Sequence, residues 1–231
     1  MFRTTRWSLI AAAGDATGPD GRQALADLCR LYWYPVYAYV RRREPDRHAA
    51  EDLTQAFFAR LLEKNDLAAA DPARGRFRSF LLTACQHFLA NRHDHDTARK
   101  RGGGVKPLSI DFGPGEERYA REPASPHTAE AEFERRWALA LLDQALNELR
   151  AEYTEAKKAE LFDALKGTLT GDSTSYRDLG GRLGLTEGAV KVAVHRLRQR
   201  YREKLRAVIA ETVDGPAAVD DELRDLFAAL G

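Results

Sequence analysis

The side chains best suited to chemistry are basic residues that recur along one predicted helix. Between Arg177 and Arg206 the chain has nine basic and three acidic residues, a net charge of +6. Lysine and arginine at this density neutralise phosphates, and in a DNA major groove either residue can pair with guanine. The chemistry that this segment favours is therefore noncovalent binding of nucleic acid. Solvated helices also carry such charge, so the local motif has to decide.

A helix-turn-helix motif positions these basic residues. Gly184 supplies the left-handed residue at the end of a first short helix, Leu185 plugs the turn, and Thr186 caps a second helix. The residues that face the core are Leu179, Leu183, Val190, Val194 and Leu197, and those that face outward are Lys191, Val192, His195, Arg196, Gln199 and Arg200. Such a helix fits the major groove, although the same geometry also occurs in ordinary helical bundles.

Helical spacing of apolar residues runs through the rest of the chain, and no strand-like alternation persists. Pro35 should kink or restart the first helix, and Asp46 can cap the next. Residues 102–126 contain five glycines and four prolines, a composition typical of a linker, with Tyr119 among the aromatic and apolar residues that allow it to dock on a surface. We therefore expect an all-α fold of two small helical domains joined by a Gly/Pro-rich linker.

Composition excludes several other classes. The chain has 231 residues, 44% hydrophobic and 31% charged, so it can form cores, and no apolar run approaches the roughly 20 residues of a membrane helix. Two isolated cysteines, Cys29 and Cys85, favour a reducing compartment, so we expect a cytoplasmic protein.

His87, His93 and His95 suggest a metal site, but His93 and His95 are two residues apart and do not share a helix face. We predict no metal, no cofactor and no catalytic residue.

Three segments, taken in order, resemble the sigma-70 family of bacterial RNA polymerase sigma factors, in its extracytoplasmic-function (ECF) group. Residues 50–62 are similar to the family's helix that binds core polymerase, residues 77–91 to the element that opens the promoter, and residues 188–198 to the upstream recognition helix. The resemblance implies that residues 1–101 form sigma region 2, 102–127 the linker and 128–212 sigma region 4. Residues 213–231 are left as an acidic amphipathic C-terminal extension.

The resemblance also implies a function: a transcription initiation factor that binds core RNA polymerase, reads the −35 and −10 promoter elements and assists DNA melting. The implied contacts with core polymerase are Asp52, Gln55, Phe58 and Arg60. Those with the −10 element are Phe77, Arg78, Ser79, Phe80, His87, Asn91 and Arg92, and those with the −35 element are Thr186, Lys191, Val192, His195, Arg196 and Arg198. Many members of the family have tryptophan at the position of Phe80.

Other interpretations stay open at this stage. A stand-alone helix-turn-helix regulator would bind duplex DNA without polymerase, and a sigma-like protein that has lost promoter melting would suit the departure at Phe80. A metal hydrolase using the three histidines is the enzyme alternative. An anti-sigma factor or another regulatory protein is an implied partner, and the apolar face formed by Leu223, Leu226, Phe227 and Leu230 would pack on a protein surface, in cis or on a regulator.

Overall fold

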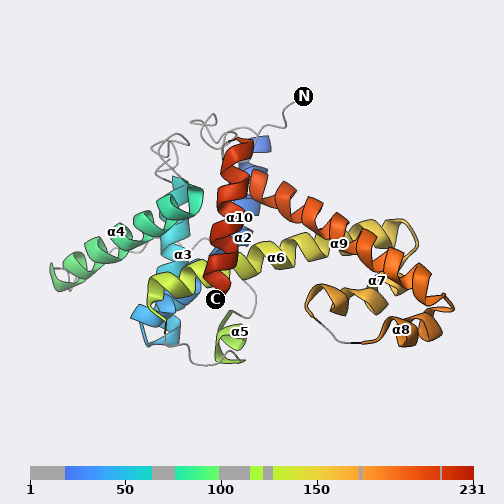
Figure 1. The fold of residues 1–231 in the computed structure, drawn as a ribbon. Helices are drawn as coiled ribbons and strands as arrows, with labels where there is room; N and C mark the ends of the chain where they lie inside the picture. The colour runs from blue at the N-terminus through green and yellow to red at the C-terminus, as the bar shows by residue number, and fades with distance from the viewer. Residues whose placement is uncertain (1–18, 64–75, 99–114, 122–126, 172–173, 214) are drawn as a thin grey trace. The chain divides into compact units, whose positions relative to one another are not determined.

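The computed structural model describes residues 19–63, 76–98, 115–121, 127–171, 174–213 and 215–231 (Figure 1). Every regular element within these ranges is helical, so the all-α prediction is confirmed. The elements are α2 (Pro19–Arg43), α3 (Arg47–Glu63), α4 (Phe77–Ala98), α5 (Gly115–Arg121), α6 (Ala129–Glu155), α7 (Ala159–Leu165), the 3-10 helix η3 (Lys166–Leu169), α8 (Tyr176–Leu183), α9 (Glu187–Ala210) and α10 (Pro216–Leu230). None of these helices is long and apolar enough to span a membrane.

Contacts divide the chain into two compact units. Unit 1 comprises residues 1–140 and 209–231, and unit 2 comprises residues 141–208. The first half of α6 and all of α10 therefore group with α2 to α5, while the helix-turn-helix lies in unit 2. The functional boundaries expected from the sequence, at residues 101, 127 and 212, stay predictions.

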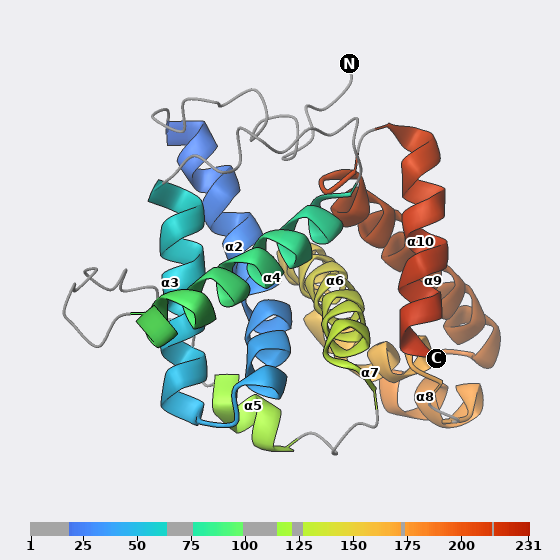
Figure 2. The same ribbon diagram turned by 90° about the vertical axis from the view of Figure 1, so that its left-hand side faces the viewer.

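Aromatic side chains of α2 are buried in the core of unit 1. In Figure 2 the ribbon of α4 runs across those of α2 and α3. Tyr32, Tyr37 and Tyr39 are at most 2% exposed. The rings of Tyr32 and Phe77 meet edge to face with centroids 5.2 Å apart, and Tyr39 meets Phe133 of α6 at 6.5 Å. Burying a large apolar side chain contributes about 1.5–3 kcal/mol, so these aromatics hold α2, α4 and α6 together.

Polar side chains fix the starts of two helices in unit 1, and the sequence predicts the first of these, the cap at Asp46. Asp46 Oδ1 accepts a hydrogen bond of 2.7 Å from the Ala49 N–H at the start of α3, and Thr128 Oγ1 accepts one of 3.1 Å from the Ala131 N–H at the start of α6. Helix α2 does not restart at Pro35, which lies inside one continuous helix. The buried surroundings of Pro35 outweigh the loss of one backbone hydrogen bond.

One segment of the predicted linker forms α5, which packs against α2. The Arg118 guanidinium lies 4.2 Å from the centroid of the Tyr34 ring, and Tyr119 meets Tyr37 edge to face at 6.3 Å. Arg41 donates a hydrogen bond of 3.1 Å to Glu116. The expectation that the linker docks on a surface is confirmed for residues 115–121, and the rest of residues 102–126 lies outside the described part.

The C-terminal helix α10 packs within unit 1. Leu226 is fully buried and Val219 is 5% exposed, whereas Leu223 and Leu230 are half-buried. Phe227 is the exception on the apolar face, with 61% of its surface exposed. The interpretation that this face packs in cis is therefore confirmed for most of its residues.

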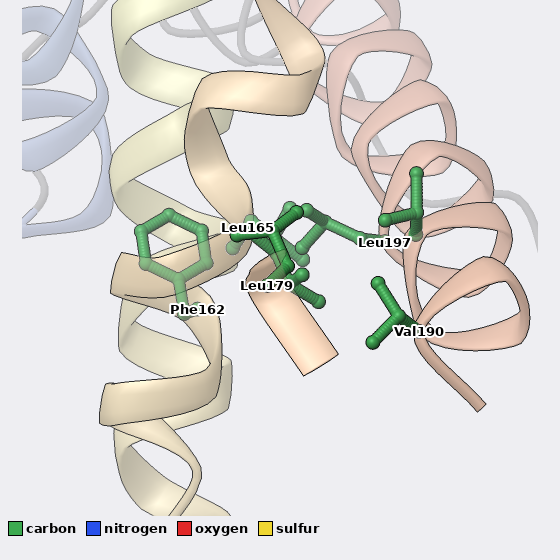
Figure 3. Close-up of a cluster of buried hydrophobic side chains, with 7 residues drawn as sticks. Phe162, Leu165, Leu179, Val190 and Leu197 are labelled. Atoms are coloured by element: carbon green, nitrogen blue, oxygen red, sulfur yellow. The ribbon is translucent and has the colours of Figure 1, made fainter. Parts of the chain in front are cut away.

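Unit 2 is organised around a cluster of fully or almost fully buried aliphatic and aromatic side chains, several of which point toward one another in Figure 3. The cluster consists of Leu149, Phe162, Leu165, Leu179, Val190, Val194 and Leu197. These residues come from α6, α7, α8 and α9, so one small core sets the orientation of the helix-turn-helix.

Candidate nucleic-acid interface

Backbone geometry closes the turn between α8 and α9. Ser175 Oγ accepts a hydrogen bond of 3.1 Å from the Asp178 N–H and caps α8. Gly184 has φ of 66°, the left-handed value predicted for it. The Leu185 N–H then donates to the Gly180 carbonyl over 2.9 Å, and a Cβ added to Gly180 would lie 2.6 Å from the Leu185 carbonyl oxygen. Only glycine fits at position 180, because any side chain there would collide with the Leu185 backbone.

The prediction that the Leu185 side chain plugs this turn is wrong. Its side chain is 40% exposed and does not plug the turn. The reason is that the Leu185 backbone, through its bond to Gly180, already closes the approach between the two helices. The side chain is left to contribute apolar surface at the rim.

The outward face of α9 is confirmed as the sequence predicts it. Thr186 Oγ1 accepts a hydrogen bond of 3.2 Å from the Ala189 N–H, which caps the helix. Val192 is 50% exposed, and His195 and Arg196 are exposed as well. The Lys191 ammonium lies 3.0 Å from Glu187, one turn earlier, in an exposed ion pair of the kind that contributes little to stability. The face therefore presents two cations, an imidazole and a small apolar group.

Arg198 is placed differently from these residues. Its guanidinium donates a hydrogen bond of 3.0 Å to the Thr168 carbonyl oxygen, at the end of η3. The Thr168 hydroxyl in turn donates to the Leu165 carbonyl, and Thr168 is 5% exposed. Arg198 thus ties α9 to the connection that follows α7, and this tie fixes the pose of the outward face.

Glu152 is a second support of α9 that the sequence did not indicate. Its carboxylate accepts hydrogen bonds of 3.0 and 2.6 Å from Arg200 and lies 3.2 Å from the Lys204 ammonium. The Arg200 guanidinium, followed by Lys204, holds the pKa of Glu152 below its ordinary value. Residues 151–172 had no predicted role, and the structure shows Glu152 and Thr168 within them bracing the second half of α9. Only a three-dimensional contact, not a local pattern, identifies them.

The DNA contacts predicted on α4, in unit 1, fall into an exposed or half-buried set and a buried set. Ser79, His87, Asn91 and Arg92 are exposed, and Phe80 is half-buried with its ring 6.2 Å from that of Phe77. The side chains of His93 and His95, from the metal-site alternative, lie outside the described part of the chain. No cluster of metal-ligating side chains occurs among the residues that are described.

The other two predicted contacts on α4, Phe77 and Arg78, are interior. Phe77 is 2% exposed against Tyr32, and Arg78 is 6% exposed. The Arg78 guanidinium lies 4.3 Å from the centroid of the Trp137 ring and donates hydrogen bonds of 2.9 Å to Glu222 and 2.8 Å to Asp225. The environment of Arg78 is thus built by α6 and α10, which sequence spacing does not reveal.

A third surface lies on α3, at the residues predicted to meet core polymerase. Asp52 is exposed, and Gln55 and Arg60 are half-buried. The Arg60 guanidinium lies 5.9 Å from the centroid of the Phe88 ring. Phe58 is 1% exposed and packs against Phe57 at 5.3 Å, so it has almost no surface to offer a partner.

Comparison with known proteins agrees with this arrangement. Residues 30–94, which include α3 and most of α4, match the family model described as Sigma-70 region 2. The chain is 29% identical over 202 residues to an ECF RNA polymerase sigma factor, SigE, of Mycolicibacterium smegmatis. That alignment covers 87% of this chain and 69% of that protein. No solved structure gives a significant match.

The helical fold and the exposed helix-turn-helix define a protein of the DNA-binding class. Residues 30–94 match region 2 of the sigma-70 family and most of the chain is similar to an ECF sigma factor, and these two findings support an ECF sigma factor of that family. Sigma factors are non-catalytic factors of RNA polymerase-associated transcription initiation, and the partners that this family implies are core RNA polymerase and promoter DNA.

Proposed function

We propose that this chain is a sigma factor that docks on core RNA polymerase through α3, reads the −35 element with α9, and reads and helps to melt the −10 element with α4. The observation that carries the proposal is the outward face of α9, a capped helix with its apolar residues in a core and its cations exposed. Two further exposed polar faces, on α3 and α4, occur in the segment that matches sigma region 2.

At the −35 element, the first turns of α9 enter the major groove. Lys191 and Arg196 pair with guanine or phosphate, His195 donates to a base edge, and Val192 packs on a thymine methyl group. Thr186 orients the helix by capping it, and Arg198 holds the helix at the correct pose through Thr168. A shift of α9 would displace all of its base contacts at once. Thr186 and Arg198 therefore affect DNA affinity by fixing the position of α9.

At the −10 element, the exposed residues of α4 meet the strand that becomes unpaired. Ser79, His87, Asn91 and Arg92 supply hydrogen bonds to bases and phosphates, and the Phe80 ring stacks on a flipped base. Phe77 supports Phe80 from the core. Phenylalanine offers less stacking area than the tryptophan common at this position, which predicts weaker capture of the base.

Docking on polymerase uses the polar face of α3. Asp52 and Gln55 make polar contacts with a partner helix and Arg60 flanks them, while Phe58 keeps α3 packed from inside. The linker then sets the distance between the two DNA-reading parts. We include an anti-sigma factor or another regulatory protein among the proposed partners, because Phe227 presents a large exposed apolar side chain on α10.

Dependence on core polymerase tests this proposal. Promoter duplex is titrated with the full chain alone and with the chain bound to core, and the complex is followed by fluorescence anisotropy at two salt concentrations. The chain should bind the promoter weakly alone and tightly with core. The Lys191→Ala, Arg196→Ala variant should lose affinity and lower the salt slope by about 2. Equal affinity with and without core would favour a stand-alone regulator and overturn the proposal.

A further inference from the structure

Two arginines at the start of α4 are enclosed by carboxylates from α10 and α6. Glu222 lies 2.9 Å from Arg76 and accepts a bond of the same length from Arg78. Asp225 pairs with both arginines, at 2.8 Å from Arg78, and Glu134 pairs with Arg78 from α6. The Arg78 side chain is 7% exposed and that of Glu222 is 1% exposed. All five residues belong to unit 1.

The charge balance of this cluster excludes a further anion. Three carboxylates face two guanidinium groups, so the donor groups of both arginines are turned toward acidic oxygens already in place. Burial raises the pKa of Glu134, while the nearby Arg78 opposes that shift. A DNA phosphate approaching Arg76 or Arg78 would meet the excess of negative charge and would have to displace carboxylates to bind.

Few fully buried apolar side chains hold α10, and with it Glu222 and Asp225, against the rest of unit 1. Helix α10 has 15 residues, and its fully or nearly fully buried apolar side chains are Val219 and Leu226. Asp225 is still 44% exposed in the cluster, and Phe227 lies on the outside. Removal of α10 would leave Glu134 of α6 as the one carboxylate of this cluster and would expose Arg76 and Arg78 on the side that α10 covers, beside Ser79 and Phe80, within the segment proposed to open the promoter.

We propose that Arg76 and Arg78 form a binding site for the phosphates of unpaired promoter DNA, and that α10 covers this site as an internal phosphate mimic. Glu222 and Asp225 occupy the positions of the phosphate oxygens. Single-stranded DNA and α10 then compete for the two arginines, so the free chain holds the −10 strand weakly until α10 is displaced. This inference rests on the proposed function, because it assigns the regulation of the same α4 surface.

The test compares full-length variants that differ in the carboxylates of α10. A fluorescein-labelled single strand of about 12 nucleotides of mixed sequence is the probe, and anisotropy gives its Kd over a range of salt concentrations. Glu222→Gln, Asp225→Asn should bind at least about tenfold more tightly than the natural chain, with a salt slope steeper by about 1.4 for two phosphates. Asp225→Asn alone, at the exposed position, should show part of the gain and guards against misfolding of the double variant.

Two matched controls make the result specific. Asp221→Asn removes the same charge from α10 at a residue that pairs with Arg224 instead, and should leave the Kd unchanged. Adding Arg76→Gln to Asp225→Asn should abolish the gain. A Kd equal to that of Asp221→Asn, or a gain that survives Arg76→Gln, would overturn the inference and make α10 a permanent structural part of unit 1.

Core binding separates this inference from the proposed function. Each variant is also titrated with core polymerase, which α3 contacts away from the altered residues. Unchanged DNA affinity in variants that bind core would refute the covering role of α10 alone. Loss of core binding in every chain, the natural one included, would instead refute the proposed function.

Discussion

Glu222 and Arg78 share a buried hydrogen bond of 2.9 Å although 144 positions separate them in the chain. Removing one partner of a buried ion pair leaves an uncompensated charge, which typically costs about 3–5 kcal/mol. The start of α4 and the C-terminal helix are therefore energetically coupled within unit 1. Changes to the carboxylates of α10 that pair with Arg76 and Arg78 should therefore affect the surface proposed to open the promoter.

Gly180 and Gly181 allow a sharp test of the turn geometry. Gly180→Ala places a Cβ 2.6 Å from the Leu185 carbonyl oxygen, whereas a Cβ on Gly181 meets no atom within 4 Å. We expect Gly180→Ala to destabilise the chain by about 1–3 kcal/mol. Gly181→Ala should stabilise it by up to about 1 kcal/mol through helix propensity. Urea unfolding followed by circular dichroism measures both, and equal stability of the two variants would contradict the described turn.

Phe77 and Phe80 should separate core packing from DNA capture. Phe77→Ala removes an aromatic ring that is 2% exposed, so stability should fall by about 3–5 kcal/mol. Phe80→Ala should cost less stability and reduce promoter opening about tenfold, because it removes a stacking surface. Permanganate reactivity of unpaired thymines reports opening, and Phe80→Trp should restore or increase it. Opening that is unaffected by Phe80→Ala would refute the stacking role.

Arg198 and Lys191 should differ in the kind of defect they cause. Arg198→Ala removes the bond to the Thr168 carbonyl and should lower stability by about 1 kcal/mol together with affinity for the −35 duplex. Lys191→Ala should leave stability within about 0.5 kcal/mol and weaken duplex binding with a smaller salt slope. If Arg198→Ala changes only the salt slope, Arg198 contacts phosphate and does not brace α9.

The ion pairs of Glu152 predict a dependence of stability on acid. Arg200 and Lys204 lower the pKa of Glu152 from the ordinary 4.5, so the folded state favours the ionised carboxylate. This stabilisation is complete above pH 4.5 and is lost as the pH falls through the lower folded pKa. Glu152→Gln should therefore be less stable than the natural chain at pH 7, by at most about 1 kcal/mol.

The same difference should be smaller at pH 3 than at pH 7, because the stabilisation is lost as the pH falls from 4.5 through the lowered folded pKa of Glu152. Urea midpoints at the two pH values measure it. Glu160→Gln, which alters an exposed carboxyl of α7, is the matched control. A stability difference that is the same at both pH values would show that Glu152 acts through packing and not through its charge.

Local patterns predicted much of this molecule correctly. The left-handed Gly184, the cap at Thr186 and the outward position of His195 follow from helix periodicity and turn chemistry, which depend on neighbours in sequence. Pro35 shows the limit of that logic, because tertiary burial keeps α2 continuous through it. The low helix propensity of proline is a local preference, and it does not include the tertiary packing that overrides it here.

What the sequence could not predict are contacts made at long range. Arg78 belongs to a segment for which the family resemblance implied DNA binding, yet its partners come from α6 and α10. Glu152 lies in a segment without a recognisable pattern and braces α9 through Arg200. Charged residues are ordinarily solvated, so a lone carboxylate in a sequence carries no sign of the guanidinium that folding brings to it.

Equilibrium binding of the full chain to core RNA polymerase tests whether this protein works by docking on core. The Asp52→Ala, Gln55→Ala variant is measured beside Glu155→Ala, Glu160→Ala, which alters two exposed side chains on other helices. We predict tight binding by the natural chain and the control, and an affinity at least about tenfold weaker for the α3 variant. No binding to a cognate core at micromolar concentration would show that the chain does not dock on core, and equal binding by all three chains would show that α3 is not the docking helix.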